Sequence, residues 1–478
     1  MTVVQDGKSD LVGTLTDGAV RVAVRVVEPL AHTLLVDTAA DVSLPDGSSW
    51  EQLTLAVEGR EIVLGRSRFD AHAAHPLRRS SDPLVPMGKG RLVFLDTVYD
   101  FSSLARKGCV VDLEQRMSQL DLMWRRKASI APPFRDYVAE MVYDLQVYRS
   151  VLDEIDSHLG SEPKPSADTV LAVATTSEYP RFCRIFDAQL ARLETLVADF
   201  SKEEHERHGY YLRKHVWDLI LASEFLARTN LKPRGYAGDS AMMHMVYDRD
   251  FRGQTLFARF LHRHPIETHA AQAVRNRIGL LSGLLTARHE AEASRLRGEP
   301  LRIMSVACGP ARELRDVITT AAQARAFSIT LLDQDTQALQ EAQSELAGIT
   351  ARVGVPIAGR VLQESVRTML RTPELDRLWG RFDFLYSMGL FDYLTPPVAR
   401  AVLMRLYSLL EPGGEMVIGN FHVGNRTRFY MEYWMDWVLF YRTEDEFLDL
   451  ASDLVGAQCS IIFEETRSQM FLRVRKAT

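Results

Sequence analysis

The order of apolar segments after Leu301 constrains the fold of this chain more than any other feature. The segments LRIMSVA, SITLLD, FDFLYS and EMVIGNF are separated by stretches long enough for a helix. Strands that alternate with helices form right-handed βαβ units around a parallel sheet. Two later segments, CSIIFEE and QMFLRVR, are a short turn apart, which predicts an antiparallel hairpin. We therefore predict a doubly wound α/β domain over residues 299–478 that ends in a hairpin.

Two regions precede this domain and make the 478-residue chain a multidomain α/β protein. Over residues 1–112, β-branched segments such as AVRVAVRVV and GRLVFLD alternate with turn residues, which predicts a small antiparallel β barrel or sandwich. Over residues 113–298 apolar residues recur every three or four positions, which predicts a helical middle region. The polar, proline-bearing residues 160–166 are predicted to form a surface linker.

Composition excludes several classes of protein. The net charge is −6, so no general electrostatic attraction to nucleic acid or anionic membrane is expected. The four cysteines form no CxxC pair, which indicates neither a zinc site nor a disulfide framework. No apolar run approaches the roughly 20 residues that span a bilayer, and the first residues do not resemble a secretory signal. We expect a cytoplasmic protein without a metal centre.

The sharpest chemical signal is the segment LRIMSVACGPARELRDV. Its strand is predicted to end at Ala307, to turn at Gly309 and Pro310, and to enter a helix near Ala311. Small side chains in such a turn let a ligand approach the backbone, and the helix amides favour an anionic or polar group. Glycine is the usual residue at several positions of this turn, but alanine stands at 307 and 311.

An acidic residue follows at the spacing of a nucleotide site. Asp333 ends the second strand, ITLLD, a little over twenty residues beyond the turn. A carboxylate there accepts hydrogen bonds from ribose hydroxyls in nucleotide-binding half-domains. Asp335 is the alternative acceptor, and a simple helix cap is the alternative role for Asp333.

Together these motifs resemble class I S-adenosylmethionine-dependent methyltransferases, which have a Rossmann-like sheet with a terminal antiparallel hairpin. The resemblance runs from about Leu301 to Arg475 and includes VACGPARE, LLDQD, FDFLYSMGLFDYL and LEPGGEMVIGNF. It implies that S-adenosylmethionine is the cofactor, with its methionine moiety by the first loop and its ribose on the acidic residue. The cofactor-binding residues predicted for this domain are Ala307, Cys308, Gly309, Arg312, Asp333, Gln334, Glu364, Ser365, Tyr386 and Ser387. A dinucleotide-dependent dehydrogenase is the competing class, but the full G-x-G-x-x-G pattern is absent and the predicted hairpin does not favour it.

A second resemblance begins upstream, at KPRGYAGD over residues 232–239. With AMMHMVYDRDF, AVRNRIG and YMEYWMDWVLFYRTEDEF, it is similar to a bacterial methyltransferase group that makes an extracellular 3-hydroxypalmitic acid methyl ester signal. This resemblance implies carboxyl O-methylation of a fatty or other small acid. Because its two glycines permit unusual backbone conformations, we predict that the segment forms a lid on the cofactor site, with Arg234, Tyr236 and Asp239 facing inward. The alternative is a helix–helix corner in which Asp239 caps the next helix.

Methyl transfer demands mainly that nucleophile, methyl carbon and sulfur be aligned, and a carboxylate acceptor needs no base. The predicted catalytic residues are His422, Asp392 and Tyr393. The predicted substrate-binding residues are Asn420, Arg426, Tyr430, Tyr433 and Trp434. Structural roles are the alternative: His422 satisfying a loop backbone, the aromatic residues packing in a core, and Arg426 lying in solvent.

The leading hypothesis is therefore an S-adenosylmethionine-dependent methyltransferase that acts on a small molecule. Methylation at nitrogen would give the same pattern, and a non-catalytic sensor of S-adenosylmethionine or a nucleotide, signalling through the β module, is the hypothesis from another class. Arg21 and Arg25, with Asp41, Ser43 and Gly47, resemble a PilZ domain that reads a cyclic dinucleotide, although the second half of that pattern is one residue too long. An interaction or homo-oligomerisation barrel is the preferred role for this module.

Overall fold

The computed structural model describes residues 11–29, 33–38, 42, 44–57, 60–70, 89–96, 127–159, 169, 172–249, 251–296 and 298–478. Its contacts divide the chain into two compact units. The first unit comprises Met1–Ala237, Phe251–His262 and Phe429–Trp437, and the second comprises Gly238–Asp250, Arg263–Arg428 and Val438–Thr478. The units are thus not consecutive in sequence, and each is considered by itself below.

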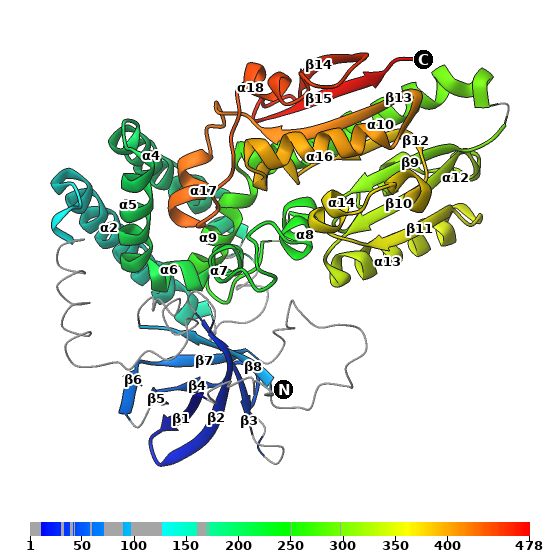
Figure 1. Ribbon diagram of the computed structural model, residues 1–478. Coiled ribbons are helices and arrows are strands. Elements are labelled where there is room, and N and C mark those ends of the chain that lie inside the picture. Colours follow the sequence, from blue (N-terminus) through cyan, green and yellow to red (C-terminus); the bar gives the residue numbers. More distant parts are fainter. Residues whose placement is uncertain are drawn as a thin grey trace, which may run out of the picture. The chain divides into compact units, whose positions relative to one another are not determined.

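The second unit is built on a seven-stranded mixed sheet (Figure 1). Its strands are β9 (Leu301–Val306), β10 (Phe327–Asp333), β11 (Ala358–Gln363), β12 (Phe382–Ser387), β13 (Leu410–Phe421), β14 (Ala457–Phe463) and β15 (Gln469–Lys476). The order is β11-β10-β9-β12-β13-β15-β14, with β15 antiparallel to both of its neighbours. The other pairings are parallel. The predicted doubly wound sheet with a terminal antiparallel hairpin is confirmed.

Helices cover both faces of this sheet because its strands are apolar on both sides. The helices of the unit are α8 (Ser240–Asp248), α10 (His269–Leu296), α11 (Leu314–Val317), α12 (Ala321–Ala326), α13 (Thr336–Val353), α14 (Val366–Arg371), α15 (Leu375–Trp379), the 3-10 helix η2 (Phe391–Tyr393), α16 (Pro396–Ser408) and α18 (Glu444–Asp449). Ile303 of β9 belongs to the core formed with α10 and α13, whereas its neighbour Met304 belongs to the core formed with α14 and α16. This alternation is the two-residue period of a strand. The parallel strands bring the ends of β9 to β13 to one edge of the sheet, which we call the carboxyl edge.

The first unit contains the antiparallel sheet predicted at the N-terminus. Its strands are β1 (Leu11–Asp17), β2 (Val20–Pro29), β3 (Thr33–Thr38), β4 (Ser49–Trp50), β5 (Gln52–Val57), β6 (Arg60–Leu64), β7 (Ser67–Asp70) and β8 (Lys89–Phe94). The order is β4-β7-β8-β3-β2-β1-β5-β6. β4, at one end of the order, pairs with β7, and β5, next to the other end, pairs with β1. Because β4 and β5 belong to the continuous segment 49–57, the sheet curves round on itself as a barrel.

The arginines of the PilZ-like pattern lie on β2 of this sheet. Arg21 and Arg25 are exposed, and Arg25 forms an ion pair with Asp37 on β3 at 3.2 Å. Asp41 and Ser43 lie outside the described residues, as do the boundary at residue 112 and the linker 160–166. Recognition of a cyclic dinucleotide and oligomerisation through this module stay predictions.

The helical part of the first unit has an aromatic core. Its helices are α2 (Pro132–Leu159), the π-helix η1 (Ala174–Glu178), α4 (Tyr179–Val197), α5 (Lys202–His215), α6 (Trp217–Ala222), α7 (Glu224–Leu231), the first part of α9 (Leu256–Ile266) and nearly all of α17 (Arg428–Trp434). Phe134 packs edge-on against His208, with ring centroids 4.9 Å apart, and Phe186 packs edge-on against Trp434 at 5.0 Å. The helix α17 therefore contributes its aromatic residues to the core of the first unit, although it follows β13 of the second.

Candidate functional site

The turn that follows β9 has an unusual backbone. Ala307, Gly309 and Ala311 have φ values of 52°, 53° and 51°, in the left-handed region that costs an alanine roughly 1–2 kcal/mol. Both alanines thus take the conformation that glycine adopts easily. Left-handed Ala311 cannot begin a right-handed helix, so the prediction of a helix near Ala311 is wrong. Instead, the amides of Ala311 and Leu314 donate to carbonyls three residues earlier, and α11 begins only at Leu314.

Asp333 joins the end of β10 to this turn. Its carboxylate accepts hydrogen bonds from the amide of Gly309 at 2.9 Å and from the amide of Asp335 at 3.0 Å. Burial raises the pKa of the Asp333 carboxyl, and these amide hydrogen bonds oppose that effect. Each oxygen retains a lone pair for a ligand hydroxyl. The neighbouring Gln334 is exposed, and Asp335 caps α13 through a hydrogen bond from Gln337.

The end of β11 contributes two predicted residues. The amide of Glu364 donates to the carbonyl of Asp333 at 3.0 Å. The hydroxyl of Ser365 accepts from the amide of Thr368 at 3.2 Å and caps α14. Glu364 therefore lies beside Asp333 at the carboxyl edge, whereas the Ser365 hydroxyl is engaged in a helix cap.

Beneath the turn, the end of β12 is tied to the end of β9. The Tyr386 hydroxyl donates to Glu313 at 2.8 Å, and the Ser387 hydroxyl donates to the carbonyl of Val306 at 2.9 Å. Tyr386 and Ser387 are fully buried, so they support the turn from within the protein. Glu313 is a buried carboxyl whose pKa is raised by burial. The thiol of Cys308 is also buried, which raises its pKa well above the usual range and keeps it protonated.

The segment after β12 holds a third buried carboxyl of this edge, that of Asp392. Asp392 accepts a hydrogen bond from the amide of Phe421 at 2.7 Å. Burial raises the pKa of Asp392 to about 7, against the opposing effects of that amide and of the charges on Arg277 and Arg442. Its neighbour Tyr393 is exposed.

The other predicted residues at the end of β13 have protein partners. Asn420 is fully buried; its amide donates to the carbonyl of Phe440 at 3.0 Å, and its oxygen accepts from Arg442. The Nε2 of His422 lies 3.0 Å from Glu444, and its Nδ1 accepts from the amide of Gly424 at 3.1 Å. Both ring nitrogens of His422 are therefore engaged, which matches the structural alternative for this residue.

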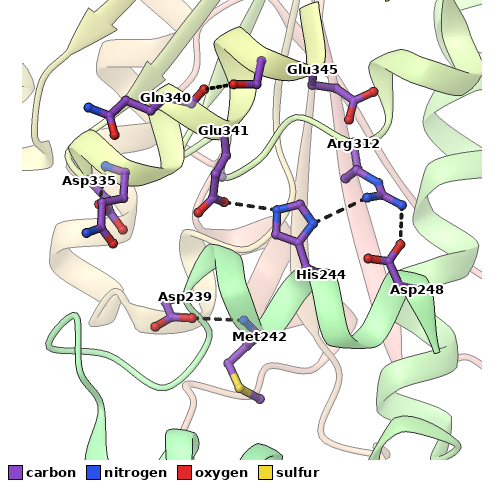
Figure 2. A network of polar contacts seen from close by, with 12 residues as sticks. Asp239, Met242, His244, Asp248, Arg312, Asp335, Gln340, Glu341 and Glu345 are labelled. Carbon is purple, nitrogen blue, oxygen red and sulfur yellow. Dashed lines mark hydrogen bonds and ion pairs between the residues drawn. The ribbon is translucent and has the colours of Figure 1, made fainter. Parts of the chain in front are cut away.

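A polar network on α8 reaches the turn from outside the sheet (Figure 2). Arg312, one residue beyond the turn, donates to Asp248 at 2.5 Å and lies 3.5 Å from His244 Nδ1. His244 Nε2 in turn lies 3.2 Å from Glu341 on α13. The sequence analysis did not assign roles to His244 and Asp248. Their spacing of four residues, which places both on one face of a helix, was the available signal.

Arg277 on α10 also lies at the carboxyl edge, and the sequence analysis did not assign a role to it. Its guanidinium donates to the Tyr247 hydroxyl at 3.1 Å and to the Met388 carbonyl at 3.4 Å. Burial alone would lower the pKa of Arg277, but Tyr247 and the charges of Glu313 and Asp392 raise it overall. The segment AVRNRIG contains this arginine, yet nothing in its local pattern distinguishes Arg277 from Arg275.

The segment KPRGYAGD crosses from the first unit to the second between Ala237 and Gly238. Asp239 is buried and accepts from the amide of Met242 at 3.0 Å, so it caps α8 as the alternative interpretation proposed. Arg234 and Tyr236 are half-buried in the first unit. A role of these residues in closing a ligand site stays a prediction.

The predicted substrate residues on α17 and before it differ in burial. Tyr430, Tyr433 and Trp434 are buried in the first unit, and the Tyr433 hydroxyl lies 2.9 Å from His205 Nδ1. This is the packing role left open for them. Arg426 is exposed on the loop after β13, at the carboxyl edge of the second unit.

Fold and site together define a doubly wound α/β protein of the kind that binds ligands outside the carboxyl ends of its strands. No group of His, Cys, Asp and Glu suited to a metal ion occurs among the described residues. Within the same part of the chain, no helix combines the length and apolar character that a membrane span requires.

Comparison with known proteins gives similarities among solved structures alone. No protein family model matches the chain, and no curated protein matches its sequence. It is similar to a protein described as a possible exported protein from Bordetella parapertussis, with 18% identity, a TM-score of 0.40 and coverage of 56% of this chain and 88% of that one. The magnesium protoporphyrin IX methyltransferase of Synechocystis PCC 6803 with bound SAH has 11% identity and a TM-score of 0.33 over 44% of this chain and 88% of that one. The N-methyltransferase NodS of Bradyrhizobium japonicum WM9 has 13% identity and a TM-score of 0.27 over 40% and 96%, respectively.

Proposed function

We propose that the second unit binds S-adenosylmethionine at the carboxyl edge of β9 and β10 and directs its methyl group to a small-molecule acceptor. The observation that carries this proposal is the pairing of the left-handed turn 307–311 with the buried carboxylate of Asp333. The turn lets a ligand lie close to the backbone, and the carboxylate can accept hydrogen bonds from the hydroxyls of a ribose.

The geometry of the turn fits a bound nucleoside. A Cβ atom built on Gly309 would meet no atom within 4 Å, so the space beside this residue is open. Asp333 accepts two amide hydrogen bonds on opposite oxygens, which fixes the orientation of its carboxylate. These features let a nucleoside lie against the backbone while its ribose hydroxyls donate to the carboxylate of Asp333, whose orientation is already fixed.

S-adenosylmethionine, when bound, supplies a methyl group on a positively charged sulfur. The contribution of the chain is to position the acceptor and to hold any proton that the acceptor releases. Asp392 suits the second task because its pKa of about 7 places its change of charge near neutral pH. His422 suits it less, since its Nε2 faces Glu444 and its Nδ1 accepts from Gly424.

Two acceptor classes follow from different observations. Resemblance to the 3-hydroxypalmitic acid methyl ester group supports carboxyl O-methylation of a fatty or small acid, which needs no base. The buried carboxyl of Asp392 favours instead an acceptor with a proton to lose, such as an amine. A sensor without turnover would need the same cofactor site but neither acceptor.

Binding and turnover test these alternatives. Titration calorimetry with S-adenosylmethionine, S-adenosylhomocysteine and a nicotinamide dinucleotide should show micromolar affinity for the first two alone. Transfer of a radiolabelled methyl group to 3-hydroxy fatty acids or to small amines then identifies the acceptor class. Binding of the dinucleotide alone would replace the proposal with a dehydrogenase, and binding without transfer to any acceptor tried would favour the sensor.

A further inference from the structure

Some described arginines of the second unit are paired with carboxylates, whereas Arg277, like Arg275 and Arg442, contacts neutral groups. Arg302 and Arg315 form ion pairs with Asp383 and Glu345, at 3.2 and 2.6 Å. Arg277 has only neutral partners: the Tyr247 hydroxyl at 3.1 Å, the Met388 carbonyl at 3.4 Å and the Met243 sulfur at 3.6 Å. Among the described residues, no carboxylate lies within salt-bridge distance of it.

Arg277 keeps its charge in these surroundings and has hydrogen-bond donors available. The side chain is half-buried, and although desolvation alone would lower its pKa, Tyr247 and the charges of Glu313 and Asp392 raise it overall. A guanidinium has five N–H donors, and the three partners above leave at least two of them available. Burial raises the pKa of both nearby acids, Glu313 and Asp392, and neither carboxyl lies within salt-bridge distance of the guanidinium.

The position of Arg277 is that of a ligand site. Met388 and Gly389 directly follow β12, and a Cβ built on Gly389 would lie 3.7 Å from a terminal nitrogen of Arg277. Its electrostatic neighbours Glu313 and Asp392 lie in the segments after β9 and β12. The strand order reverses between β9 and β12, and ligands of doubly wound sheets bind at such a switch point.

The helix α8 fixes the guanidinium in this position. Met243 and Tyr247, four residues apart on one face of α8, contact the same terminal nitrogen, at 3.6 and 3.1 Å. Neither partner neutralises the charge, so the cation is oriented while its charge is preserved. A planar guanidinium held in this way matches the two oxygens of a carboxylate.

We propose that Arg277 binds a carboxylate at the switch point between β9 and β12, either that of the cofactor's methionine moiety or that of the acceptor. This inference rests on the proposed function, because it assumes that the carboxyl edge holds cofactor and acceptor together. The site would then recognise a carboxylate group, on either the cofactor or the acceptor.

The first arm of the test concerns the cofactor. S-adenosylhomocysteine and 5′-methylthioadenosine share the nucleoside, but the second lacks the amino-acid carboxylate. If Arg277 binds that carboxylate, Arg277→Gln lowers affinity for S-adenosylhomocysteine by about 10- to 100-fold, the loss of a charge-assisted hydrogen bond. Affinity for 5′-methylthioadenosine stays within about two-fold of wild type.

The second arm concerns the acceptor. Protein saturated with S-adenosylhomocysteine is titrated with a 3-hydroxy fatty acid and with its primary amide. If Arg277 binds the acceptor, Arg277→Gln weakens binding of the acid by about 10-fold or more and leaves binding of the amide unchanged. In this case the affinity for S-adenosylhomocysteine is also unchanged.

Two variants separate recognition from folding. Arg275→Gln removes the same charge from the same helix, where Arg275 donates to the carbonyls of Val246 and Ile266. This variant should keep the wild-type preference for S-adenosylhomocysteine over 5′-methylthioadenosine and for the acid over the amide, even if it lowers the thermal midpoint of unfolding. Arg277→Lys keeps the charge without the planar fork and should retain part of the affinity.

The outcomes distinguish the two proposals. If wild type binds S-adenosylhomocysteine and Arg277→Gln changes neither the cofactor ratio nor the acid-to-amide ratio, the inference about Arg277 is wrong and the proposed function stands. If wild type binds neither S-adenosylhomocysteine nor 5′-methylthioadenosine, the proposed function fails first.

Discussion

The Asp333 carboxylate accepts a hydrogen bond from the Gly309 amide at 2.9 Å, so the end of β10 holds the turn that follows β9. A second amide, that of Asp335, occupies the other oxygen at 3.0 Å. The carboxylate is therefore part of the frame of the turn as well as the proposed ribose acceptor. Replacing it tests both roles, and the two can be told apart.

Asp333→Asn should lower affinity for S-adenosylmethionine by about 10-fold or more, because it replaces a charged acceptor at the proposed ribose position with a neutral one. Asp333→Ala should also reduce the free energy of unfolding by about 1–3 kcal/mol, since the two amides lose their acceptor. Calorimetry and chemical denaturation measure the two effects. Asp335→Asn is the matched control: it retains the cap of α13 and should bind normally. If Asp333→Asn binds S-adenosylmethionine normally and Asp335→Asn binds it more weakly, Asp335 is the ribose acceptor instead.

Ala307→Gly should increase the free energy of unfolding by about 0.5–1 kcal/mol. The substitution relieves a left-handed alanine, worth roughly 1–2 kcal/mol, against the entropy that glycine gains in the unfolded chain. Ala311→Gly should be nearly neutral, because it also removes a fully buried methyl group. Ala347→Gly, at an exposed position of α13, is the control and should cost about 1 kcal/mol. Equal losses in Ala307→Gly and Ala347→Gly would argue against strain in the turn.

Local patterns account for what the sequence predicted of this fold. The sheet was predictable because each apolar strand is visible in a few consecutive residues. The hairpin was predictable because only a short turn separates CSIIFEE from QMFLRVR. The helix start near Ala311 was wrong because left-handed φ at an alanine leaves no composition signal. Arg277 and His244 could not be identified in the same way, because each gains its meaning from segments far away in sequence: Met388 for the arginine, and Arg312 and Glu341 for the histidine.

The network on α8 should be energetically coupled to the turn. In a double-mutant cycle of Asp248→Asn and Arg312→Gln, we expect a coupling energy of about 0.5–1 kcal/mol, the range of a partly exposed ion pair. Arg312→Gln should also weaken binding of S-adenosylmethionine several-fold more than Arg315→Gln, whose ion pair with Glu345 ties α11 to α13. Chemical denaturation of wild type, the two single variants and the double variant gives the coupling energy. Calorimetry of wild type, Arg312→Gln and the control Arg315→Gln gives the affinities. A coupling energy indistinguishable from zero would mean that α8 does not hold the turn.

The buried carboxyl of Asp392 should make the second unit less stable as the pH rises. Its pKa is raised from 3.8 to about 7, so between these values the folded state holds a proton that the unfolded state has released. The contribution of Asp392 to the free energy of unfolding is then greatest at low pH and falls as the pH rises through about 7. From about pH 5 to about pH 8, the contribution of Asp392 should decrease by about 2–3 kcal/mol.

Asp392→Asn should remove this dependence, because asparagine is a neutral isostere that still offers an oxygen to the Phe421 amide. It should therefore be more stable than wild type at about pH 8 and close to it at about pH 5. Asp316→Asn, on the exposed side of α11, is the control and should leave the wild-type profile unchanged. If Asp392 also holds the proton released by an acceptor, the rate of methyl transfer in wild type should rise with pH through about 7, and the variant should lose activity without losing affinity for S-adenosylhomocysteine. A variant with wild-type turnover would restrict Asp392 to a structural role and favour an acceptor that is already ionised.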